Sequence, residues 1–151
     1  MKKIALAVMV VALTGCASVQ YGDKAAEVNL KKFPTVSGKT SLYVCRVSGF
    51  VASGVTSTVL VDGKDIGNLK PETFVHAVLE PGEHAVQLVH DGINGSSGIH
   101  KIQTKSDELA FVWAGVTGGG WGVLTVDDFK TKQEAYNCVS DAAYSVTSRT
   151  K

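Results

Sequence analysis

Residues 59–89 read VLVDGKDIGNLKPETFVHAVLEPGEHAVQLV, and this stretch decides the fold because it joins two turn signals to runs of alternating apolar residues. The first signal is Asp62-Gly63, which has apolar residues on both sides. Asp-Gly supplies the positive φ angles that a two-residue hairpin turn needs. The sequence therefore predicts a hairpin between strands over residues 56–61 and 64–69.

The second signal is Glu80-Pro81-Gly82-Glu83. Pro81 pre-sets φ at the second position of a turn, and Gly82 tolerates the next one. This predicts a hairpin between strands over 73–79 and 84–90, in which Leu79 pairs with His84. One face of both strands is then buried. That face consists of Val75, Ala77, Leu79, Val86 and Leu88, with Ala77 opposite Val86 and Val75 opposite Leu88.

The remaining chain continues the pattern of short strands separated by turns. Further strands are expected at residues 42–47, 99–104, 108–114 and 123–126. The turn at Ser106-Asp107 predicts a third hairpin, which aligns Ile102 with Phe111. Such spacing indicates an all-β fold, an antiparallel β-sandwich of about seven to eight strands.

The spacing of apolar residues becomes helical near the end of the chain. Asp127 or Asp128 can cap a helix N-terminus. The apolar positions that follow are Phe129, Tyr136, Val139, Ala143 and Val146. We therefore expect a C-terminal α-helix over much of 128–146, packed on the sheet. The folded domain is expected to cover residues 40–147.

The composition of the 151 residues is typical of one globular domain, with a net charge of +1. Lysine and arginine are scattered along the chain rather than clustered. A nucleic-acid partner is therefore not expected.

The N-terminal residues have the character of an export signal. Lys2-Lys3 precedes an apolar run, Ile4 to Leu13, which is too short to span a bilayer. The run ends in Leu13-Thr14-Gly15-Cys16, which resembles the lipobox of bacterial lipoproteins. The resemblance implies removal of the signal peptide 1–15 and attachment of acyl chains such as palmitate to Cys16. With Ala17 rather than Asp next in the chain, it also implies an outer-membrane lipoprotein whose domain faces the periplasm.

Residues 16–39 are expected to be the lipidated cysteine and a flexible tether. The segment is polar, mixed in charge, and carries Pro34 and Gly38 near its end. A short helix over 25–33, docked on the domain, is the alternative. That helix would be too short to be stable alone in water.

A resemblance to a known family rests on several short motifs. They are Cys16, Leu42-Tyr43-Val44-Cys45-Arg46, Val61-Asp62-Gly63, Ile66-Gly67 and Glu80-Pro81-Gly82-Glu83-His84. Together they resemble bacterial lipoproteins with domain of unknown function 2846, and the core is similar to PEGA β-sandwich domains. The resemblance covers residues 38–126 and implies a β-sandwich in the cell envelope. It implies no reaction.

The cysteines other than Cys16 are Cys45 and Cys138. An even remainder in an oxidising compartment is typical of one disulfide, which would tie the first strand to the C-terminal helix. A regular helix would put Cys138 about half a turn from its Phe129/Tyr136 face. A helix that ends near Asn137 removes this conflict. The alternative, a catalytic thiol, lacks a C-x-x-C motif or a candidate base.

Glycine-rich residues near the end of the β pattern leave two interpretations open. In the first, Gly118, Gly119, Gly120, Trp121 and Gly122 form a loop between strands that presents Trp121 as a contact point. In the second, 109–126 is a membrane-associated helix with G-x-x-x-G pairs. No Lys-Ser/Thr follows the glycines, so a phosphate-binding loop is not expected.

The histidines, His76, His84, His90 and His100, all fall on expected strands. Their spacing does not predict a metal site, because His84 and His90 would lie about 20 Å apart along a strand. His84 is expected to contact the turn before it. No catalytic residues, metal or cofactor are predicted.

The expected function is that of a non-enzymatic binding or scaffolding module, anchored in the envelope and with an envelope protein as its candidate partner. The alternatives are a glycine-rich membrane-associated structural lipoprotein built on residues 109–126, and a periplasmic enzyme.

Overall fold

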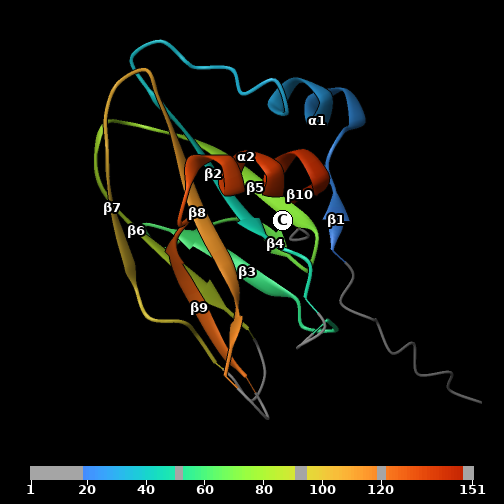
Figure 1. Ribbon diagram of the computed structural model, residues 1–151. Helices are drawn as coiled ribbons and strands as arrows, with labels where there is room; N and C mark the ends of the chain where they lie inside the picture. The colour runs from blue at the N-terminus through green and yellow to red at the C-terminus, as the bar shows by residue number, and fades with distance from the viewer. Residues whose placement is uncertain (1–18, 50–52, 91–94, 119–121, 148–151) are drawn as a thin grey trace, which may run out of the picture.

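The computed structural model describes residues 19–49, 53–90, 95–118 and 122–147. These residues form a mostly β fold with two facing sheets and two helices, α1 (Lys24–Leu30) and α2 (Lys132–Asp141) (Figure 1). The described residues hold ten strands rather than seven or eight. The six-stranded sheet has the order β1 (Gln20–Tyr21), β10 (Ala143–Val146), β5 (Thr73–Leu79), β2 (Thr40–Arg46), β8 (Glu108–Thr117), β9 (Val123–Asp128). The four-stranded sheet has the order β4 (Lys64–Leu69), β3 (Ser57–Val61), β6 (Gly82–Val89), β7 (His100–Thr104).

Strand β2 is the centre of the larger sheet, and every one of its residues is buried. It pairs antiparallel with β5 and parallel with β8. A second parallel pair joins β10 to β5. The sheet is therefore mixed, whereas the turn signals predicted only antiparallel pairs.

The first predicted hairpin is confirmed. Strands β3 and β4 pair antiparallel around Asp62 and Gly63, whose φ angles are 50° and 76°. These are the left-handed conformations that the Asp-Gly pair was expected to supply.

We expect Gly63→Val to lower the free energy of unfolding by more than about 1 kcal/mol, because a β-branched residue opposes φ of 76°. Thermal melts measure the effect. Gly98→Val is the matched control, because Gly98 is exposed, has no positive φ and would meet no atom within 4 Å of an added Cβ. Equal melting temperatures for the two variants would contradict this prediction.

The second and third predicted hairpins are wrong. Strands β5 and β6 lie in different sheets, and so do β7 and β8. The chain crosses from one sheet to the other at residues 80–81 and again at 105–107. Turn chemistry reverses the chain, but it does not decide whether the next strand pairs with the previous one or faces it.

Part of the predicted face is nevertheless buried, because strands of two sheets that face each other also bury one side each. Val75, Val86 and Leu88 belong to one core between the sheets, and Leu79 packs against it. Ala77 is half-buried and is not part of that core.

A second core lies on the outer face of the larger sheet and consists mainly of aromatic rings. Tyr43, fully buried, stacks on Phe111 with a 5.4 Å distance between ring centroids. Phe33 lies 5.6 Å from the Tyr43 ring and 4.6 Å from that of Tyr136 on α2. Through these ring contacts, α2 and the segment after α1 pack against the sheet.

The predicted C-terminal helix is shorter than expected and does not end the fold. Thr131 caps α2, since its hydroxyl accepts a hydrogen bond from the Glu134 N–H, so neither Asp127 nor Asp128 is the cap. Ala142 is extended and stops the helix. Ala143 and Val146 then belong to β10, where parallel pairing with β5 overrides their helical spacing.

The tether expected over residues 16–39 is wrong for its described part. Strand β1 pairs with β10, and α1 packs beside it. An added Cβ on Gly22 would lie 2.2 Å from the Tyr144 ring, so glycine is needed for this close approach. The docked alternative, a short helix, is the one that the structure contains, because tertiary contacts supply the stability that it lacks alone.

The contact that holds α1 in place is a buried carboxylate. Glu27 is 6% exposed, and its two oxygens accept hydrogen bonds from Lys24 Nζ at 2.6 Å and from the Tyr144 N–H at 3.0 Å. Lys31 Nζ lies 3.1 Å away. Burial alone would raise the pKa of Glu27, but these donors outweigh it and lower the pKa to about 2.

Because this pKa is lower in the folded chain than the ordinary value of 4.5, Glu27 stabilises the fold above pH 4.5 and loses that contribution as the pH falls towards 2. We expect Glu27→Gln to be clearly less stable than the unsubstituted chain at pH 6 and nearly equal to it at about pH 2. Urea unfolding at several pH values measures this. Glu83→Gln, which removes an exposed ion pair with Lys101, should change stability by less than about 1 kcal/mol at any pH. A constant difference for Glu27→Gln across the range would contradict the assignment.

Candidate functional site

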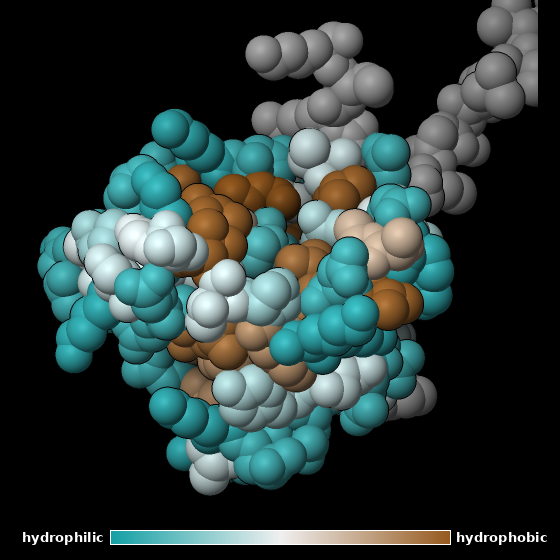
Figure 2. All heavy atoms as spheres, turned by 90° about the horizontal axis from the view of Figure 1, so that it is seen from above, coloured by the Kyte–Doolittle hydropathy of each residue, from teal (hydrophilic) through white to brown (hydrophobic). Residues whose placement is uncertain are grey.

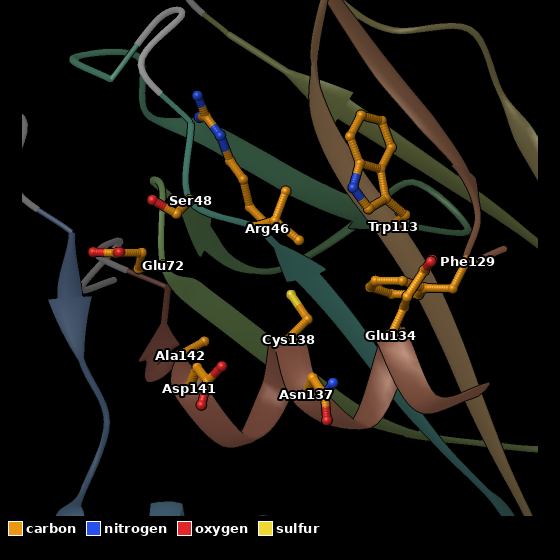
Figure 3. Close-up of a pocket in the computed structure, with 11 residues that line it drawn as sticks. Arg46, Ser48, Glu72, Trp113, Phe129, Glu134, Asn137, Cys138, Asp141 and Ala142 are labelled. Carbon is orange, nitrogen blue, oxygen red and sulfur yellow. The ribbon is translucent and has the colours of Figure 1, made fainter. Parts of the chain in front are cut away.

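A pocket of about 380 Å³ opens between α2 and the end of the larger sheet (Figure 3). Trp113 and Phe129 form one side, Glu72 lies on the opposite side, α2 is below, and Arg46 and Ser48 are above in this view. The lining residues are Arg46, Val47, Ser48, Glu72, Trp113, Phe129, Glu134, Asn137, Cys138, Asp141 and Ala142.

The helix that forms the floor is covalently fixed to the sheet. Cys138 on α2 is joined to Cys45 on β2, as the sequence predicted, with a Cα–Cα distance of 6.3 Å. The conflict foreseen for a long helix does not arise, because α2 begins at Lys132, after Phe129, and buries Ala135, Cys138 and Val139. It continues past Asn137 to Asp141, so the predicted end near Asn137 is wrong. The floor of the pocket therefore cannot move away from β2 while the disulfide is intact.

The aromatic wall depends on a glycine two residues along the same strand. A Cβ added to Gly115 would lie 2.3 Å from Cη2 of Trp113, so the indole ring lies directly across Gly115. Trp113 is half-buried and also borders a smaller cavity of about 180 Å³, which shares Arg46, Val47 and Ser48 with the first. The ring is thus a wall between two hollows.

The polar part of the lining is mainly acidic. Glu134, Asn137 and Asp141 are exposed and share one side of α2, since they are three and seven residues apart. Glu72 is also exposed.

Among the described residues of the lining, Arg46 is the one cation; it is 4% exposed and donates from Nη1 to the Val55 carbonyl oxygen at 2.6 Å. Its guanidinium extends away from α2, and burial lowers its pKa (Figure 3). The exposed charges that line the pocket are therefore negative.

Glu72 and Asp141 occupy positions that are unfavourable for the stability of the fold. Glu72 has φ of 61°, and its backbone is held there by hydrogen bonds between its N–H and Arg46 O and between its carbonyl and the Ala143 N–H. Asp141 occupies the last turn of α2, where a carboxylate opposes the helix dipole and no basic residue compensates. Local rules are broken most often at functional sites.

Neither the strands nor the helix brings a histidine into this lining. Of the lining residues that the structure describes, Ser48 alone carries a hydroxyl, and the sulfur of Cys138 is held in the disulfide. Across the described residues, no group of three or more His, Cys, Asp and Glu side chains could hold a metal ion. The lining offers aromatic faces and carboxylates, which suit a cationic group.

Other sequence-predicted site residues lie elsewhere or outside the described residues. Cys16, Gly119, Gly120 and Trp121 are outside them. Gly118 and Gly122 flank the β8–β9 connection, with φ of 86° and 67°. The described residues of the segment 109–126 are not a helix, since β8 and β9 form an antiparallel pair there. Within the described ranges, neither helix is long and apolar enough to cross a membrane.

His84 has the structural role expected for it. Its ring nitrogens lie 2.8 Å from the Glu80 carbonyl oxygen and 2.7 Å from Asp62 Oδ2, so it bridges two turns. Burial lowers the pKa of His84, but these acceptors outweigh it and the net shift is upward. His76 is beside Tyr43, and burial lowers its pKa to about 4. His90 and His100 reach Thr56 O and Asp128.

Sequence reasoning missed the pocket because its walls come from distant segments. Trp113 was predicted only as part of a strand, and no site role was predicted for Glu72, Glu134 or Asp141. The one available signal was the acidic side of a helix with an uncompensated acid in its last turn.

Comparison of the chain with known protein families, with curated proteins and with solved structures found no match.

Proposed function

We propose that this protein is a non-enzymatic binding module of the cell envelope, anchored by lipid at Cys16, whose pocket takes a cationic group. The observation that carries the proposal is the pocket lining: Trp113 and Phe129 lie beside three exposed carboxylates, two of which belong to α2, the helix that the disulfide fixes to the sheet. A cation over an aromatic face gains roughly 0.5 to 2 kcal/mol, and nearby carboxylates add to it.

The anchor is supported by the N-terminal sequence. Lys2-Lys3, the apolar run that follows and Leu13-Thr14-Gly15-Cys16 have the order of a lipoprotein signal. With Ala17 after the cysteine, the proposed location is the outer membrane, with the domain facing the periplasm. The similarity to lipoproteins with domain of unknown function 2846 is part of this proposal.

Cys16→Ser tests the anchor. The variant should leave the membrane fraction and appear as soluble or uncleaved protein, because the acyl chains that anchor it are gone. Fractionation with outer membranes like the unsubstituted protein would reject Cys16 as the anchor.

Fluorescence of Trp113 tests the pocket. The chain has two tryptophans, so a Trp121→Phe background leaves Trp113 as the single reporter. Titration with tetramethylammonium should give a saturable change in emission, whereas neutral tert-butanol of similar size should not, because the carboxylates discriminate by charge.

Matched variants distinguish binding at the pocket from a general effect of the protein's charge. Glu134→Gln/Asp141→Asn should weaken tetramethylammonium binding by about tenfold, which corresponds to about 1.4 kcal/mol. Glu83→Gln removes one acid from the other sheet and should leave binding unchanged. Equal binding by all these proteins, or equal response to tert-butanol, would reject the cationic ligand.

The contact loop proposed for Gly118–Gly122 is a separate proposal. Trp121→Ala should keep the melting temperature and weaken recovery of cross-linked envelope proteins. A stability loss of about 3 to 5 kcal/mol would make Trp121 a core residue instead.

A further inference from the structure

One surface of the N-terminal segment combines exposed apolar and basic side chains. Tyr21 on β1 is 52% exposed and Val28 on α1 is 51% exposed. Lys24, Val28 and Lys32 follow at intervals of four residues, which puts them along one side of α1 and the turn after it. Lys70 Nζ lies 4.9 Å from the centroid of the Tyr21 ring. We call Tyr21, Lys24, Val28, Lys32 and Lys70 the α1 surface.

Contacts on the inner side of the segment hold this surface outward. Glu27 is buried against the Tyr144 N–H, and Leu30 packs into the aromatic cluster while its carbonyl accepts a hydrogen bond from the Tyr43 hydroxyl. The opposite side of α1 therefore faces solvent. Figure 2, which looks down on the molecule from the α1 end of Figure 1, shows hydrophobic residues between hydrophilic ones on that face of the molecule.

The charge of the segment is basic. Within residues 19–39, lysines outnumber carboxylates: Lys24, Lys31, Lys32 and Lys39 are set against Asp23 and Glu27, and Glu27 is buried. The whole chain is nearly neutral, with a net charge of +1. Exposed apolar residues among lysines are the pattern of a helix that lies on an anionic lipid surface.

The position of the proposed anchor points to the same occupant. Gln20, where β1 begins and pairs with β10, is four positions after Cys16 in the chain. Fully extended, four residues reach at most about 14 Å. The headgroup layer on one side of a bilayer takes about 5 to 8 Å of that distance. If Cys16 is lipidated, the start of β1 therefore lies close to the headgroups, and α1 follows β1 after Gly22 and Asp23.

We propose that the α1 surface rests on the anionic phospholipid headgroups of the leaflet that holds the anchor. This rests on the proposed lipid anchor at Cys16. The docked β1 and α1 replace a long tether, so the domain has one preferred face towards the membrane. Val28 and the Tyr21 ring enter the headgroup layer, and the lysines bind lipid phosphates.

The test replaces natural acylation with chemical coupling. The chain from Cys16 onward is attached through the Cys16 thiol to a maleimide lipid in vesicles of phosphatidylcholine and phosphatidylglycerol, with Cys45 and Cys138 held in their disulfide. Acetylation rates of single lysines are then measured by mass spectrometry. This readout does not depend on whether cells lipidate Cys16, so its failure and that of the Cys16→Ser test are distinguishable.

We expect Lys24 and Lys32 to react at least about threefold more slowly on vesicles than in the uncoupled protein. Lys101 on β7, which is 67% exposed, should react at an unchanged rate. Unchanged rates at Lys24 and Lys32, or equal slowing of all lysines including Lys101, would overturn the proposal.

A pair of double variants adds a control for charge. In Val28→Glu/Lys32→Glu, the slowing at Lys24 should disappear, because the surface becomes acidic and loses its apolar centre. Ile99→Glu/Lys101→Glu makes the same change at exposed positions before and on β7 and should keep the slowing. Persistent slowing in the first variant would also overturn the proposal.

Discussion

Replacing both disulfide cysteines, in Cys45→Ala/Cys138→Ala, is expected to lower the free energy of unfolding by roughly 4 to 5 kcal/mol. The bond closes a loop with a sequence separation of 93 residues, and a loop of this length restricts the unfolded chain strongly. Urea unfolding monitored by circular dichroism measures the loss.

Reduction of the unsubstituted chain is the control. With a phosphine reductant, it should unfold at the same urea concentration as the double variant, and the variant itself should not respond to the reductant. A reductant-insensitive midpoint for the unsubstituted chain would contradict the prediction. If the double variant still folds, its binding of tetramethylammonium should be weaker, since α2 forms the floor of the pocket.

The second large effect is expected at the aromatic cluster. Tyr43→Ala should cost about 3 to 5 kcal/mol, because the ring is fully buried and stacks on Phe111. Tyr43→Phe should cost only about 1 kcal/mol, the typical value of the lost hydrogen bond to Leu30 O. Thermal and urea unfolding measure both.

Tyr21→Ala is the matched control, since this tyrosine is 52% exposed and should change stability by less than about 1 kcal/mol. Similar losses for Tyr43→Ala and Tyr21→Ala would mean that the cluster does not hold the helices. Burial and, secondarily, Tyr136 raise the pKa of Tyr43 to about 12, so its hydroxyl stays protonated and able to donate at neutral pH.

The parts of the fold that the sequence predicts are those governed by local chemistry. Asp62-Gly63 determines the β3–β4 hairpin because two adjacent residues suffice to set the turn. Alternation identifies Val75 and Leu88 as buried without saying whether their strands are paired or facing. The disulfide was predicted from residue count and compartment, which also need no tertiary information.

The parts that the sequence does not predict depend on contacts between distant segments. The parallel pairing of β2 with β8 joins segments that are far apart in the chain, and no motif in the sequence marks it. α1 is too short for its own residues to predict it. It is held by the contact between Glu27 and Tyr144, which are 117 residues apart. The pocket is similar, since Arg46, Trp113 and Asp141 meet only after the sheet and α2 have formed.

The position of β10 affects the order in which the strands of the larger sheet can pair. This strand is the last element of the described chain, yet it lies between β1 and β5, and Tyr144 also fixes Gly22 and Glu27. While the chain is made from its N-terminus, β1 thus has no strand to pair with among the described residues until residues 143–146 arrive. Pairings across such sequence distances form slowly. In a newly made chain, Gln20 and Tyr21 would therefore stay accessible to other molecules until β10 joins the sheet beside them.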